Sequence, residues 1–286
     1  MNNHLRPILF MLGSALCFAV MNMVIRYVNH LPVFELAFFR AIGTVLCTTF
    51  VLTTQRIPML GNNPKILIAR ALVGTISMLL YYKAIQVMPI GTAAALRYLS
   101  PFFAAGLAIM LLGERMKKLQ WLCFAIAFAG VVILKGFDSR LSLFGLTIIL
   151  TSAFFSGLVY VIIRKIGDTE HPVVVVNYFL VFCALVCGIL SIFNWQQPSG
   201  NEWVMLLSLG FFGYIAQILM TKAMQTEETN LIVPFKYAEV VFTIIFAWMI
   251  FGEGQSWLAL VGILIIVLAL IGNVVVKNRK FPKTNS

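Results

Sequence analysis

The sequence predicts an all-α integral membrane protein of ten transmembrane helices, arranged as two inverted five-helix repeats. Three observations lead to this fold class. The 286-residue chain is 61% hydrophobic and only 11% charged, whereas about a quarter of the residues of a soluble domain are charged. Its apolar residues fall into runs of roughly 20 residues, each long enough to cross a hydrocarbon core of about 30 Å. Residues 83–114 also resemble residues 222–253 without a gap.

The apolar runs are joined by short connections, which leave no room for a soluble domain. The ten expected spans are residues 7–28, 33–54, 65–88, 90–112, 119–135, 143–166, 173–194, 202–224, 229–251 and 256–277. The fifth is the shortest. Because nearly the whole chain lies in these runs, any site must be built inside the membrane.

The internal repeat rests on polar matches, because apolar helices resemble one another readily. At a constant offset of 139 residues, the matched pairs include Lys83/Lys222, Gln86/Gln225, Arg97/Lys236, Tyr98/Tyr237, Phe103/Phe242 and Glu114/Glu253. A match at an offset of 138 extends to Ile25-Arg26 and Ile163-Arg164. We therefore expect a first repeat over residues 1–136, a second over residues 143–278, and a basic cytoplasmic tail over residues 279–286.

The positive charges indicate the orientation of the chain. One set of helix ends carries twelve Lys and Arg residues and the opposite set carries three, which predicts cytoplasmic termini by the positive-inside rule. Because each repeat has an odd number of spans, five, the second repeat must cross the membrane in the opposite orientation to the first. Accordingly, Arg115, Lys117 and Lys118 follow the first Gly-Glu turn, whereas no cation stands at the matching positions after the second. We expect a multi-pass protein of the plasma (bacterial inner) membrane.

Several short motifs carry a family resemblance. They are the paired Gly-Glu turns at 113–114 and 252–253, Pro-Val-Phe-Glu-Leu-Ala-Phe-Phe-Arg at 32–40, the Lys-Ala pairs at 83–84 and 222–223, and Leu-Ser-Pro at 99–101. In these the chain resembles the drug/metabolite transporter (DMT) superfamily, with two EamA-type repeats over nearly its whole length. The resemblance implies a ten-helix bundle whose central cavity is lined mainly by the first, third, fourth, sixth, eighth and ninth spans. Because family members move amino acids, nucleotide-sugars, cationic drugs and organic acids, it leaves the substrate open.

Ionisable residues inside spans are costly, so each is a candidate functional residue. Arg97 lies about two turns inside the fourth span, and its guanidinium is a bidentate donor suited to carboxylate or phosphate. Lys236 occupies the mirrored position on the ninth span, with Glu239 on the same helix face. We predict that Arg97 and Lys236 are opposed substrate anchors and that Tyr98 and Tyr237 are walls of the site.

Structural alternatives stay open for these charges. Arg97 could pair with a helix carbonyl or with Glu35, and Lys236 and Glu239 could neutralise each other. A Glu239 carboxylate that is free to change protonation would instead couple transport to protons. It could also bind the amine of a zwitterion.

Other polar residues are expected near the cavity. Those predicted to contact substrate, or else to pack at the membrane interface, are Asn22, Tyr81, Tyr82, Tyr160 and Gln217. Those predicted as gate or coupling residues are Lys83, Lys222, Arg40, Glu35 and again Glu239.

Each of these groups also has a structural interpretation. Lys83 and Lys222 could merely anchor helix ends. Arg40 and Glu35 are five residues apart, hence on different helix faces, and could bridge to other helices. Arg70 is expected to reach the membrane interface. Glu114 and Glu253 are expected to cap or brace helix ends.

Motifs of enzymes are missing from the sequence. It contains no Gly-x-x-x-x-Gly-Lys-Ser/Thr phosphate loop and no Gly-x-Ser-x-Gly turn. His4, His30 and His171 are too scattered for a metal site, and the five cysteines fall inside spans, where thiols usually pack. We therefore predict no catalysis, no cofactor, no metal and no nucleic-acid partner.

The predicted function is secondary active transport, by alternating access, of a small organic metabolite that is anionic or carboxylate-bearing. Its expected partners are that metabolite, a coupling proton or counter-substrate, and the lipid bilayer. One alternative is a carrier of zwitterionic or cationic metabolites, amino-acid-like or S-adenosylmethionine-like, or a drug exporter. An alternative of another class is an integral membrane enzyme or lipid-handling protein.

Overall fold

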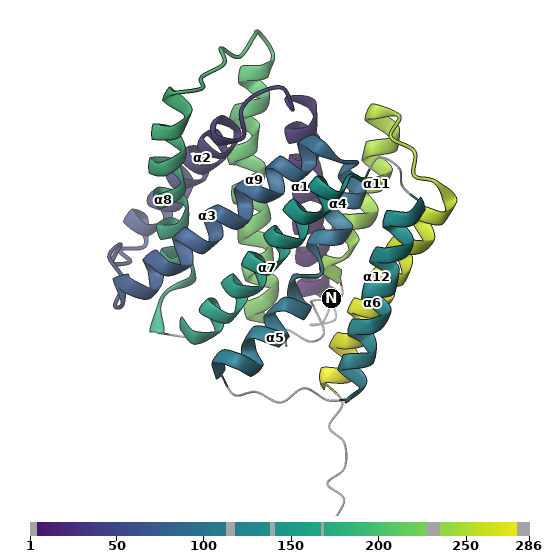
Figure 1. The fold of residues 1–286 in the computed structure, drawn as a ribbon. Coiled ribbons are helices and arrows are strands. Elements are labelled where there is room, and N and C mark those ends of the chain that lie inside the picture. The colour runs from purple at the N-terminus through teal and green to yellow at the C-terminus, as the bar shows by residue number, and fades with distance from the viewer. Residues whose placement is uncertain (1–4, 113–117, 138–140, 167–168, 227–234, 279–286) are drawn as a thin grey trace, which may run out of the picture.

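The computed structural model describes residues 5–112, 118–137, 141–166, 169–226 and 235–278 (Figure 1). Within these residues the chain forms helices and turns and no strand. The helices are α1 (Leu5–Tyr27), α2 (Val33–Thr54), α3 (Pro64–Val87), α4 (Ile90–Arg97), α5 (Ser100–Leu112), α6 (Lys118–Phe137), α7 (Leu143–Ile166), α8 (Pro172–Ile192), α9 (Glu202–Thr226), α11 (Ala238–Phe251) and α12 (Trp257–Asn278). By length and composition, seven of the described spans can cross a membrane, and α6, α11 and α12 contain shorter apolar helices.

The fourth expected span is broken rather than continuous. α4 ends at Arg97, Tyr98 and Leu99 form a turn, and α5 begins at Ser100. Pro101 has no backbone N–H to donate to the Arg97 carbonyl, and its ring would clash with that carbonyl in a continuous helix. In the second repeat, the matching residue Tyr237 also lies in a turn, directly before α11. A helix is therefore interrupted at the equivalent tyrosine of each repeat, Tyr98 in the first and Tyr237 in the second.

Helix packing is symmetric under exchange of the repeats. The contact of α1 with α9 is matched by that of α7 with α3. Likewise, the contact of α2 with α9 is matched by that of α8 with α3, and the contact of α1 with α11 by that of α7 with α5. The equivalent helices α2 and α8, and α6 and α12, pack against each other, and α4 of the first repeat packs on α11 of the second. In Figure 1 the α6–α12 pair stands on one side of the bundle and α2, α3 and α8 on the other.

The two repeats run in opposite directions through the bundle. The end of α1 lies at the end of α3, because Arg26 donates to the Ile85 carbonyl. The start of α7 lies at the same place, because a Cβ on Gly145 would lie 3.0 Å from the Met88 side chain, directly after α3. α1 thus ends where its equivalent α7 begins. We call this end of the bundle the Arg26 end; it is the upper end in Figure 1.

α2 and α9 touch through their backbones. A Cβ on Gly43 would lie 2.8 Å from the Gly210 Cα, and a Cβ on Gly210 would lie 2.6 Å from the Gly43 Cα. Small residues permit such crossings between helices in a membrane, where packing rather than the hydrophobic effect holds helices together. This contact joins the two repeats beside the buried core.

Candidate functional site

A buried carboxylate lies where the broken helices of the two repeats meet. Glu239, in the first turn of α11, accepts a hydrogen bond from the Tyr98 hydroxyl at 2.5 Å and one from Asn22 Nδ2, on α1, at 3.2 Å. Only 8% of its surface is exposed. Within the described residues no cation forms an ion pair with Glu239, so neutral donors and the positive end of α11 satisfy its charge.

The two helix breaks are packed against each other. The rings of Tyr98 and Tyr237 meet edge to face with centroids 5.2 Å apart, and the Tyr98 hydroxyl lies 3.3 Å from the Lys236 carbonyl oxygen. α4 also packs directly on α11. The mirrored tyrosines therefore join the helix break of the first repeat to that of the second.

Arg97 stands beside this carboxylate with an aromatic partner. Its guanidinium lies 3.9 Å from the centroid of the Tyr81 ring, a cation–π contact, and its side chain is half-buried. No acid of the described chain pairs with it, and Glu35 instead accepts from the Gln196 backbone N–H at 3.2 Å. The Arg97–Glu35 pair considered from the sequence is therefore absent from the described residues.

Lys236 also contacts aromatic rings rather than the neighbouring acid. Its ammonium lies 3.4 Å from the Tyr160 hydroxyl, 5.6 Å from the Tyr160 ring centroid and 5.9 Å from the Tyr98 ring centroid. In the described structure Lys236 and Glu239 do not form the ion pair that was the structural alternative. We call Asn22, Tyr81, Arg97, Tyr98, Tyr160, Lys236, Tyr237 and Glu239 the central cluster. It holds two cations and one acid, each bound by neutral groups.

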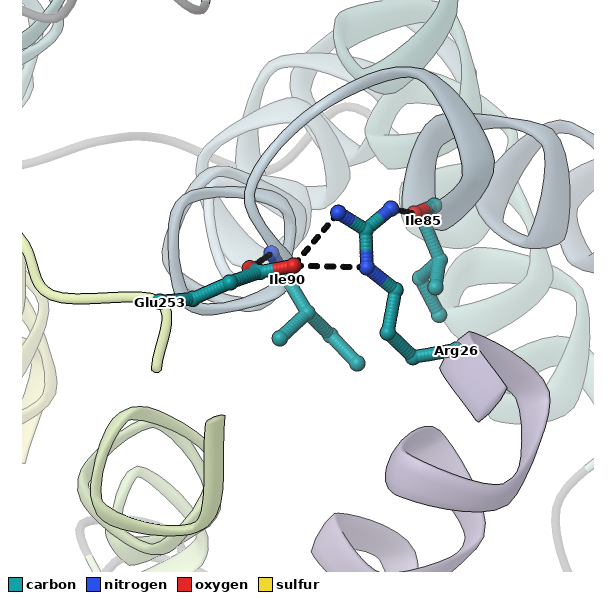
Figure 2. Close-up of polar contacts among 4 residues, drawn as sticks. All are labelled: Arg26, Ile85, Ile90 and Glu253. Carbon is teal, nitrogen blue, oxygen red and sulfur yellow. Dashed lines mark hydrogen bonds and ion pairs between the residues drawn. The ribbon is translucent and has the colours of Figure 1, made fainter. Parts of the chain in front are cut away.

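An ion pair joins several helix ends at the Arg26 end of the bundle (Figure 2). Arg26 Nε donates to Glu253 Oε1 at 2.7 Å, and a second guanidinium nitrogen forms an ion pair with the same oxygen. Arg26 Nη1 donates to the Ile85 carbonyl at 2.9 Å, and the Ile90 N–H lies 3.3 Å from Glu253 Oε2. The contacts join the ends of α1 and α3, the start of α4 and the turn after α11. Glu253 braces helix ends, as expected, and Glu114 lies outside the described residues.

Exposure of the central cluster increases away from that ion pair. Asn22, Tyr81 and Tyr237 are at most 2% exposed, whereas Arg97 and Lys236 are half-buried and Tyr160 is 38% exposed. Tyr160 lies in the second half of α7, which begins at the Arg26 end. The most exposed residue of the cluster therefore lies in the half of α7 that is farther from the Arg26 end.

Three predicted site residues lie in other contacts. Arg40 Nη1 donates to the Tyr82 hydroxyl at 3.0 Å and lies 3.0 Å from Met78 Sδ, so Tyr82 binds Arg40 rather than Glu239. Arg40 forms no ion pair with Glu35, which agrees with their placement on different helix faces. Gln217 lines a small cavity next to Thr48, away from the contacts of the cluster.

The remaining cations differ in burial. Lys83 and Lys222 are exposed near helix ends, so the structure does not bring these predicted gate residues to the central cluster. Arg70 is only 8% exposed and stacks 4.2 Å from the Phe179 ring centroid, so the expectation that it reaches the membrane interface is wrong. Its ring partner on α8 could not be identified from the α3 sequence alone.

Arg26 is the residue that sequence reasoning missed. In the sequence, Arg26 is distinguished only as one charge of the topology pattern and by its match to Arg164. No group of three or more His, Cys, Asp and Glu residues in the described ranges could hold a metal ion. Cys183 and Cys187 are free thiols with their sulfurs 3.7 Å apart.

A multi-pass helical membrane protein, with a polar cluster where two inverted repeats meet, is the architecture of a membrane transporter. The model of the EamA-like transporter family matches residues 5–135 and 143–275. The chain belongs to this family, whose fold is that of the drug/metabolite transporters, and it is a transporter rather than an enzyme.

Known relatives are similar over almost their full length. The pseudopaline exporter CntI of Pseudomonas aeruginosa is 29% identical over 90% of this chain and 92% of its own. The S-adenosylmethionine uptake transporter of Rickettsia prowazekii is 24% identical over 95% of this chain and 93% of its own. A solved crystal structure superposes with a TM-score of 0.69, covering 95% of this chain and 96% of its own, at 18% identity. That last likeness shows the fold alone.

Proposed function

We propose that the protein is a secondary active transporter of a small organic metabolite that bears a carboxylate, which binds at Arg97. The observation that carries this proposal is the Arg97 guanidinium, held over the Tyr81 ring with no acid of the described chain as its partner. A ring contact leaves the guanidinium N–H donors available for a bidentate carboxylate. Lys236 adds a second positive charge, so the central cluster has an excess of one cation over acids.

A zwitterionic metabolite is the second candidate, and Glu239 favours it. Its carboxyl group is bound by the neutral donors Tyr98 and Asn22 rather than by a cation of the described chain, so it is available to an ammonium group of the solute. A solute with both charges would place its carboxylate at Arg97 and its amine at Glu239. S-Adenosylmethionine, taken up by the Rickettsia prowazekii relative, carries both groups of an amino acid.

Alternating access follows from the inverted repeats in this proposal. The Arg26–Glu253 ion pair joins helix ends at one end of the bundle, while Tyr160, the most exposed residue of the cluster, lies in the half of α7 farther from that end. Exchange of conformations between the two similar repeats would reverse this arrangement. The distribution of Lys and Arg favours the Arg26 end as the outer end, so in this proposal the ion pair belongs to a state in which the outer end is closed.

A thermal-shift comparison of matched solutes tests the proposal. Purified protein is heated with small carboxylates, with the amides of the same acids, with amino acids and with the corresponding amines. A ligand at 100 times its Kd stabilises by about 2.7 kcal/mol, so we expect carboxylates or amino acids, but not the amides, to raise Tm. The shift should disappear in Arg97→Met and persist in Lys65→Gln, a control at an exposed cation.

The pattern among solutes then distinguishes the two candidates. Stabilisation by simple carboxylates assigns the substrate to the anionic class, and stabilisation by amino acids alone assigns it to zwitterions. Stabilisation by amines alone, unchanged in Arg97→Met, would contradict the role of Arg97. Uptake of the stabilising solute into proteoliposomes would then measure transport itself.

A further inference from the structure

Two arginines outside the central cluster are buried without an acid. Arg40, on α2, is 6% exposed and Arg70, on α3, is 8% exposed. Neither belongs to an ion pair in the described part of the chain. A buried charge normally has a partner of opposite sign, because removing it from water is costly.

The two guanidinium groups lie about one helical turn apart along α3. Arg40 Nη1 lies 3.0 Å from Met78 Sδ. Arg70 Nη1 lies against Gly74, where an added Cβ would be 2.6 Å from it. Gly74 and Met78 are four residues apart on the same helix face, a separation of about 6 Å. The two positive charges therefore lie close enough to repel each other.

Contacts with α8 locate the two arginines independently of their contacts with α3. The Arg70 guanidinium stacks on Phe179, and Cys183, one turn further along α8, approaches the Ala37 carbonyl at 4.0 Å. Ala37 is one turn before Arg40 on α2. Two neighbouring turns of α8 thus face the two arginines, and both charges occupy the space between α2, α3 and α8.

Three N–H groups of the pair lack an acceptor. Arg40 Nε and the Nε and Nη1 atoms of Arg70 are buried and have no hydrogen-bond partner within the described structure. Arg40 Nη1 donates to the Tyr82 hydroxyl, and the Arg70 guanidinium lies against the face of Phe179. Two like charges with three unused donors are suited to a negatively charged ligand.

We propose that Arg40 and Arg70 together bind a small inorganic anion of the size of chloride. Both arginines are more than 90% buried, so an ion of this size, rather than a metabolite, is the anion that the pair can take up. The cavity of about 20 Å³ beside Thr48 is lined by neither arginine. This anion site is separate from the substrate contacts at Arg97.

The test is the thermal stability of the purified full-length protein in sodium chloride and in sodium gluconate at equal ionic strength. Chloride at about 100 times its Kd should raise Tm by roughly 5 °C in a saturable way. The chloride-dependent rise in Tm should disappear in Arg70→Met. It should persist in Lys65→Gln, which removes an exposed cation from the same helix. Equal Tm values in the two salts, or an undiminished increment in Arg70→Met, would overturn the proposal.

A second variant decides the question if Arg70→Met does not fold. Met78→Glu places a carboxylate between the two arginines, so we expect a raised Tm in gluconate and no further rise with chloride. A chloride increment retained in Met78→Glu contradicts the assignment. Sodium acetate forms a third arm: stabilisation by acetate without stabilisation by chloride would assign the donors to an organic carboxylate and reject the inorganic ion.

Discussion

The Tyr98 hydroxyl donates a hydrogen bond to the Glu239 carboxylate at 2.5 Å and thereby joins the broken helix of the first repeat to that of the second. Tyr98 lies in the turn after α4 and Glu239 in the first turn of α11. Because the donor and the acceptor belong to different repeats, any relative movement of the repeats must stretch or release this bond. The hydrogen bonding of the Glu239 carboxylate is thus linked to the contact between the two repeats.

Removing that donor should weaken solute binding without unfolding the protein. Tyr98→Phe retains the edge-to-face ring contact with Tyr237 and loses only the hydroxyl. A hydrogen bond to a charged group contributes about 1.5–3 kcal/mol, so we expect a loss of affinity of roughly ten-fold or more. Isothermal titration with the solute found by thermal shift measures the change. Tyr27→Phe, at a residue 55% exposed, is the matched control and should bind normally.

Neutralising Glu239 should separate proton coupling from solute exchange. Glu239→Gln keeps an acceptor for Tyr98 and Asn22 but cannot take up a proton. We expect proteoliposomes with this variant to exchange labelled solute at a rate independent of pH and to lose accumulation driven by a pH gradient. If the pH profile of the variant matches that of the unaltered protein, Glu239 is not the coupling group.

Breaking the ion pair at the Arg26 end should open that end of the bundle. Glu253→Gln removes the charge that binds Arg26 and weakens the acceptor of the Ile90 N–H. In a background without native cysteines, Ile90→Cys should then react faster with a membrane-impermeant thiol reagent. Ile90 is fully buried in the closed end.

The thiol-labelling experiment needs a control position whose reactivity should not change when the ion pair is broken. Leu60→Cys, at a residue 76% exposed at the opposite end, is the control and should label at one rate with or without Glu253→Gln. Equal Ile90→Cys rates in both backgrounds would show that the ion pair does not close this end.

The crossing of α2 and α9 should not tolerate a methyl group. Gly43→Ala introduces a Cβ 2.8 Å from the Gly210 Cα, so the two backbones must separate. Overpacking of this kind costs about 1–3 kcal/mol, and we expect a lower Tm in detergent. Gly106→Ala is the helical control, because a Cβ there meets nothing within 4 Å. A Tm loss in Gly106→Ala as large as in Gly43→Ala would assign the effect to glycine replacement in general.

Several features of the site were predictable because they are local in the sequence. The mirrored pairs Arg97/Lys236 and Tyr98/Tyr237 were visible as an internal repeat, and both pairs lie at the helix breaks. The breaks themselves were not predicted, although Pro101 was a signal for the first. Partners in space were harder to predict. Arg70 stacks on Phe179, more than a hundred residues away, and nothing in the neighbourhood of Arg70 indicates that ring.

The sequence by itself determined the membrane class, the number of spans and the inverted repeat, because hydropathy and charge act on each segment separately. Only the tertiary structure decided which charges are paired. Lys236 and Glu239 are only three residues apart in the sequence, yet Lys236 contacts Tyr160 of α7 and Glu239 binds Tyr98 in the turn after α4. Arg26 and Glu253, 227 residues apart, form the ion pair instead. Spacing along a helix sets which side chains can meet, but the packing of other helices decides which partner lies within hydrogen-bonding distance.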